Sequence, residues 1–183
     1  MKTDKKAVYF ISRTAMGIAL VILAQLIGKM LPAGAVIAGP FSVTQLVTGS
    51  LVNCVLFVFT AQVGILSGVC IGILSSVLAS IIGIGPAVIA VVPLVAAGNC
   101  IIAIVYGLIG KHSRIGGTAA AAVLKCAFLW LTVPALLHAI GAPEKQTAAL
   151  SIMFSWPQGI TALIGGALAL VIVPRLKKLR TDT

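Results

Sequence analysis

Long apolar blocks separated by short polar or glycine-rich segments dominate the chain. An α-helix of about 20 apolar residues crosses the ~30 Å hydrocarbon core of a membrane. The pattern therefore predicts membrane spans at roughly residues 8–30, 43–60, 62–83, 88–110, 117–140 and 148–173. Because the connecting segments are short, we expect an all-α membrane protein in which residues 1–183 form a single integral membrane domain, a six-transmembrane-helix bundle.

Glycine and proline mark the connections between these spans. Residues 31–42 contain Pro32, Gly34, Gly39 and Pro40, which is typical of a loop. Glycine-rich turns are also expected at residues 83–86, 110–116 and 141–147, and a tight connection is expected near residues 61–62.

The cations are distributed unevenly between the two sides that this topology defines. Lys29 and Lys145 fall on one side. The other side receives Lys2, Lys5, Lys6, Arg13, Lys111, Arg114, Arg175, Lys177, Lys178 and Arg180. Basic residues accumulate on the cytoplasmic side of membrane proteins, so we expect both termini to be cytoplasmic and the chain to be a multi-pass protein of the cell (plasma) membrane. The net charge of +10 then indicates contact with anionic membrane lipid and not nucleic acid.

Composition narrows the possible functions. Apolar residues make up 60% of the chain, the mean hydropathy is +1.19, and the only acidic residues are Asp4, Glu144 and Asp182, all outside the apolar blocks. The sequence thus offers no carboxylate for a proton relay within the membrane, and no phosphate-binding GxxxxGK[ST] motif. The cysteines occur singly, which does not favour a metal site. We expect no enzyme, no catalytic residue, no metal and no cofactor.

Prolines within the predicted spans suggest a cavity. Pro93, Pro134 and Pro157 each fall in the outer half of a span, where a proline removes a backbone hydrogen bond and bends the helix. Three bends at similar depth would open a cavity toward the outside.

The densest group of candidate ligand-binding residues surrounds Pro157. Ser155, Trp156 and Gln158 offer a hydroxyl, an indole and an amide in the outer third of the last span. Trp156 could instead be an interfacial anchor, but an anchor does not require its polar neighbours. His138, near the outer end of the fifth span, is a weaker candidate for the same cavity.

Polar residues inside the other spans are further candidates, because a buried polar group costs free energy unless it is paired. Asn99 suits either a polar ligand or an interhelical hydrogen bond, whereas Asn53 favours the interhelical role. Gln45 could face a ligand or lipid headgroups. Lys125 is the one charged residue well inside a span, and we expect its side chain to extend to the inner surface or to contact a subunit, with pairing to an anionic ligand as the alternative.

These features together resemble a known family, the substrate-binding S components of energy-coupling factor (ECF) vitamin transporters. The similarity covers nearly the whole chain. It depends on size, six spans and cytoplasmic termini, and on Ala15 and Ala19 in an AxxxA spacing. It also depends on three segments, at residues 46–53, 92–99 and 154–166, which read LVTGSLVN, VPLVAAGN and FSWPQGITALIGG.

The resemblance implies a subunit that binds a vitamin or related micronutrient in a cavity on its outer side. It implies three partners: a scaffold transmembrane subunit, which would contact Ala15 and Ala19, and two ATPase subunits that hydrolyse ATP. The S component would then topple in the membrane to release its cargo inside. The alternatives are a self-sufficient secondary transporter or channel for a small solute, and a purely structural or assembly protein.

Overall fold

The computed structural model of the protein describes residues 2–31 and 36–181. Pro32 and Gly34 of the first expected loop lie outside the described residues, as do Asp182 and Thr183. The side chains of Lys2 and Arg180, which the sequence leads us to expect on the cytoplasmic side, also lie outside the described part.

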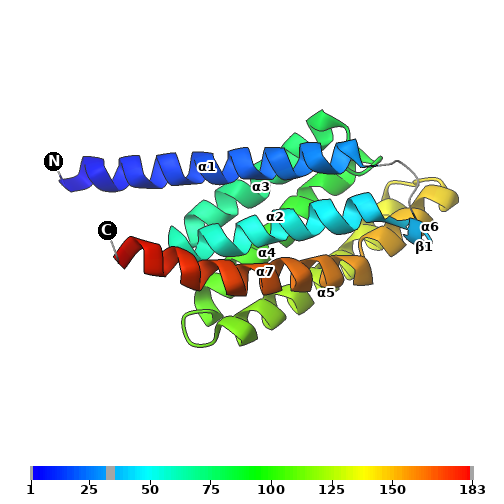
Figure 1. Ribbon diagram of the computed structural model, residues 1–183. Helices are drawn as coiled ribbons and strands as arrows, with labels where there is room; N and C mark the ends of the chain where they lie inside the picture. Colours follow the sequence, from blue (N-terminus) through cyan, green and yellow to red (C-terminus); the bar gives the residue numbers. More distant parts are fainter. Residues whose placement is uncertain (1, 32–35, 182–183) are drawn as a thin grey trace.

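The described chain is helical apart from one short hairpin and the connecting turns (Figure 1). The elements in order are α1 (Lys2–Met30), β1 (Val36–Ala38), β2 (Phe41–Ser42), α2 (Val43–Gln62), α3 (Ile65–Ile82), the 3₁₀ turn η1 (Ile89–Val91), α4 (Val92–Ile109), α5 (Arg114–Ala139), α6 (Glu144–Met153) and α7 (Trp156–Thr181).

Six helical segments are long and apolar enough to cross a membrane, as predicted for a multi-pass membrane protein. Helices α1, α2, α3 and α5 each form one such segment, η1 and α4 together form another, and α6 with α7 form the last. The six-helix bundle predicted from the hydrophobic pattern is therefore confirmed. The N- and C-terminal ends lie at the same end of the bundle (Figure 1).

The last predicted span differs in detail from the structure. Two helices replace one, because the chain turns at Phe154 and Ser155 between α6 and α7. The Ser155 amide donates a 3.2 Å hydrogen bond to the Ile152 carbonyl, a tightened bond typical of a helix end. Helix α6 also begins at Glu144, within the segment expected to be a loop.

Local sequence signals account for several helix ends. Ser42 precedes α2, and its side chain accepts a 3.2 Å hydrogen bond from the Gln45 amide. Gly83 ends α3 with φ of 83°, a left-handed conformation that glycine adopts without a Cβ clash. The hairpin was not predicted: Val36 pairs with Ser42, and Ala38 with Phe41, around Gly39 and Pro40.

Small residues allow close helix contacts in the interior. Gly72 places α3 directly against α4, because a Cβ there would lie 3.1 Å from the Asn99 Cβ. Gly165 likewise lets α7 pack directly against α2, because an added Cβ there would lie 2.7 Å from the Cys54 amide nitrogen. Polar groups on neighbouring helices can therefore reach one another through short side chains.

The topology can be tested with a reporter fused after Thr183. We expect activity from a reporter that works only in the cytoplasm, because the cations collect at the end of the bundle that holds both termini. Activity from a reporter that works only outside the cell would invert the predicted orientation.

Candidate functional site

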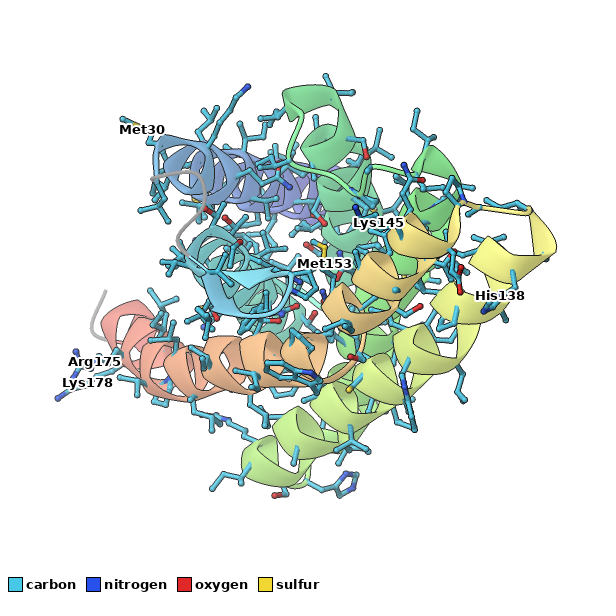
Figure 2. All side chains as sticks on the ribbon, turned by 90° about the vertical axis from the view of Figure 1, so that its right-hand side faces the viewer. Met30, His138, Lys145, Met153, Arg175 and Lys178 are labelled. Atoms are coloured by element: carbon cyan, nitrogen blue, oxygen red, sulfur yellow. The ribbon has the colours of Figure 1, made fainter. Side chains whose placement is uncertain are left out.

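A cavity of about 230 Å³ lies at the end of the bundle opposite the two termini. Figure 2 looks onto this end, where Met153 of α6 lies near the centre of the bundle and His138 of α5 at its periphery. The start of α2, the turn after α3, and the break between α6 and α7 all contribute residues to the cavity wall. Residues from helix ends and from helix interiors thus form the cavity wall together, and none of the three predicted proline bends contributes to it.

Lys125 lies in the wall of this cavity, at the centre of a cluster of polar side chains. Its side chain is only 3% exposed, although it stands near the middle of α5. The ammonium nitrogen donates one hydrogen bond of 2.8 Å to Asn53 Oδ1 on α2 and another of 2.8 Å to Asn99 Oδ1 on α4. Two neutral amide oxygens on different helices thus accept hydrogen bonds from the buried Lys125 side chain.

The two asparagines extend this cluster to other helices. Asn53 Nδ2 donates to Thr161 Oγ1 on α7 at 3.3 Å, and Thr161 donates to the Gln158 carbonyl at 3.1 Å. Asn99 Nδ2 lies within hydrogen-bonding distance of the Gly72 carbonyl and of Ser75 and Ser76 Oγ on α3, at 3.1–3.3 Å.

Helix α1 joins the same cluster. Gln25, which is 2% exposed, donates through Nε2 to the Ser75 carbonyl at 2.7 Å. The polar groups around Lys125 therefore connect α1, α2, α3, α4, α5 and α7.

Donor and acceptor chemistry fixes the orientation of the amides. A lysine ammonium can only donate, so each asparagine must turn its oxygen toward Lys125 and its NH₂ group away. A backbone carbonyl can only accept, so Gln25 must turn its NH₂ group toward Ser75. For the same reason Gln45 turns its NH₂ group toward the Met153 carbonyl, at 3.0 Å.

These orientations leave the amide oxygens of Gln25 and Gln45 without partners beside the cavity. Gln25 Oε1, Gln45 Oε1 and the Thr48 hydroxyl, which can donate or accept, are buried and have no hydrogen-bond partner among the described residues. All three residues line the cavity. An unsatisfied buried polar atom costs about 1–3 kcal/mol, so a bound molecule that donates hydrogen bonds to them would recover that cost.

The structure brings together only some of the candidate ligand-binding residues. Gln45, Asn99, Lys125 and Gln158 line the cavity. Three other candidates, Ser155, Trp156 and His138, are not among the residues that form its wall.

The three remaining candidates have other surroundings. Trp156 is 44% exposed, and its ring packs edge-to-face on Phe41, with ring centroids 5.3 Å apart. Ser155 donates its hydroxyl hydrogen to the Ile152 carbonyl at 2.7 Å. His138 is exposed at the end of α5 (Figure 2).

The preferred prediction for Lys125 was wrong. We expected its side chain to extend to the inner surface or to contact a subunit. Instead it remains buried, because Asn53 and Asn99 supply acceptors that replace water around the ammonium group.

The proline bends were also predicted incorrectly. Pro93 and Pro157 lie in the first turns of α4 and α7. A backbone amide in the first turn has no hydrogen-bond partner within the helix, so a proline there does not bend it. Only Pro134 of the three lies inside a helix, α5.

Sequence reasoning missed Gln25, Thr48 and the pair Ser75–Ser76. Gln25 could have been recognised from the sequence, because a glutamine side chain inside an apolar span needs a hydrogen-bond partner. The serines gave no such signal, because a serine inside a membrane helix can satisfy its hydroxyl on its own helix. Here both do so, donating to the Gly72 carbonyl, and their oxygens still accept from Asn99.

Ala15 and Ala19 lie away from the cavity on α1. Both are exposed on the surface of the bundle. Their neighbours Thr14 and Gly17 are buried, so α1 turns one face to the bundle and keeps the alanine pair outside. The pair is free to contact another helix.

Comparison with known proteins identifies no family for this chain. No protein-family model matches the chain, and neither the curated proteins nor the solved structures contain a match.

The contribution of the Lys125 cluster to stability can be measured. Asn53→Ala removes one of the two acceptors for the buried ammonium group, and we expect it to lower the free energy of unfolding by about 1–3 kcal/mol. Thermal and denaturant unfolding in detergent would report the change. Ser50→Ala is a matched control, because Ser50 is 5% exposed on the same helix and its hydroxyl has no hydrogen-bond partner among the described residues. Equal losses in the two variants would show that the Lys125–Asn53 bond contributes little.

Proposed function

We propose that the chain is the substrate-binding subunit of an ATP-driven importer of the ECF type, located in the cell membrane and specific for a vitamin or related micronutrient. The observation that carries this proposal is a largely apolar cavity, with a few polar groups in its wall, at the end opposite the termini. Its buried acceptors, Gln25 Oε1 and Gln45 Oε1, have no partner among the described residues, so the cavity is chemically suited to a small polar molecule.

The segments that resemble the S components support the same proposal. Thr48, Asn99 and Gln158 come from the three separate segments at residues 46–53, 92–99 and 154–166, and all three residues line the cavity. Segments far apart in the sequence thus contribute to one site.

In this proposal the chain supplies binding, and partner subunits supply energy. A scaffold transmembrane subunit would dock on α1 at the exposed Ala15 and Ala19, and two ATPase subunits would drive the toppling that releases the cargo inside. The small alanine side chains allow a partner helix to approach the α1 backbone closely.

Small molecules extracted from the purified protein, and identified by mass spectrometry, would name the substrate directly. The identified compound, in labelled form, then allows uptake measurements with and without the partner subunits. Uptake by this chain alone, in vesicles without ATP, would favour a self-sufficient secondary transporter or channel and contradict the proposal.

Cavity variants test the location of the site. Gln25→Leu and Gln45→Leu keep much of the side-chain volume but remove the unpaired acceptors. Loss of one buried hydrogen bond costs about 1–3 kcal/mol, so we expect each variant to bind the identified compound roughly five- to 150-fold more weakly. Equilibrium binding to the isolated protein provides the measurement. Gln146→Leu, at an exposed position of α6, is the matched control, and unchanged binding in both cavity variants would place the site elsewhere.

The docking surface is tested separately. Ala15→Trp with Ala19→Trp places two large rings on the exposed face of α1. We expect the isolated variant to bind the identified compound normally, because neither residue lines the cavity, while uptake by the assembled complex is lost. Normal uptake by the double variant would remove these residues from the docking surface.

A further inference from the structure

The buried ammonium group of Lys125 has a consequence for the chemistry of the ligand. Both of its hydrogen-bond partners are neutral amides. No acidic residue lines the cavity in the described part of the chain. Amide dipoles lower the cost of burying a cation, but they do not neutralise its charge.

A protonated lysine carries three N–H donors, and Asn53 and Asn99 accept hydrogen bonds from two of them. Lys125 itself forms part of the cavity wall, so in its protonated form the third donor and the positive charge belong to a residue that a ligand can contact. We infer from this geometry that the cavity binds a small carboxylate, whose anionic group pairs with Lys125. This inference rests on the proposed function, and it specifies the chemical class of the substrate.

The number of charges favours a carboxylate over a phosphate monoester. One lysine provides a single positive charge. A phosphate monoester carries about −1.5 to −2 at pH 7 and would leave an excess negative charge in the cavity, whereas a carboxylate carries one.

The remaining polar groups define what else the molecule must carry. Gln25 Oε1 and Gln45 Oε1 are acceptors, so they suit hydroxyl or N–H donors elsewhere on the ligand. The volume of about 230 Å³ lies below the roughly 300–1,000 Å³ usual for ligand pockets, which points to a small molecule. The inferred ligand is therefore a compact hydroxy or amino carboxylate.

Matched pairs of probes separate charge from shape. Butyrate and benzoate would be compared with butyramide and benzamide, which have nearly the same size but no charge, at equal ionic strength in detergent. A probe at about five times its Kd raises the apparent Tm of a protein of this size by about 2–4 °C. We expect the carboxylates to stabilise the wild-type protein and the amides to have less effect.

Two variants locate the effect. Lys125→Met should abolish the stabilisation by carboxylates, whereas Lys145→Met, which removes an exposed lysine at the same end of the bundle, should retain it. If Lys125→Met does not fold, the comparison of carboxylate with amide on the wild-type protein still decides the question. No stabilisation of the wild-type protein by either carboxylate, or equal stabilisation by the amides, would overturn the inference.

The substrate extracted from the purified protein distinguishes this inference from the proposed function. An uncharged compound that is imported only with the ATPase partners would overturn the carboxylate inference and leave the proposed function intact. Stabilisation by carboxylates that depends on Lys125, together with uptake that needs no partner, would contradict the proposed function and leave the carboxylate inference intact.

Discussion

The buried ammonium group of Lys125 is the constraint on which the rest of the interior depends. A cation removed from water costs several kcal/mol unless other groups replace its hydration. Asn53 and Asn99 do so from two different helices, at 2.8 Å each. This fixes the positions of α2 and α4 relative to α5, and Gly72 then lets α3 approach Asn99 closely enough to accept from its NH₂ group.

The same constraint explains why polar side chains border a cavity inside the bundle. Apolar side chains from facing helices would fill the space if nothing polar had to be accommodated, as they do around Leu129 and Val133. Around Lys125 the helices instead present asparagine, glutamine and serine, whose hydrogen bonds have specific directions. Once the asparagines and the Gln25 and Gln45 NH₂ groups are paired, the leftover acceptors remain beside a space of about 230 Å³.

The sequence predicted the helices better than the site, for physical reasons. Burial in lipid depends on composition averaged over about 20 residues, so six spans could be recognised without knowing any contact. The side-chain environment of one residue depends on which helices pack together. Lys125 was misplaced because its two acceptors lie 72 and 26 residues away in the chain, and Trp156 was placed in the cavity although its ring faces Phe41. Asn99 and Gln45 were identified because their chemistry alone required a partner.

Helix α1 connects the two halves of the proposed function. Ala15 and Ala19 are exposed where the proposed partner would dock, and Gln25 reaches the cavity from the same helix, roughly 15 Å from Ala15 at 1.5 Å per residue. Ligand contacts that make binding tight also slow release, because affinity differences appear mostly in the dissociation rate. A partner that displaced α1 would draw Gln25 away from the Ser75 carbonyl and from the ligand together. Docking at Ala15 and Ala19 would then weaken ligand binding in the cavity through α1 alone, without a conformational change passing through the other helices.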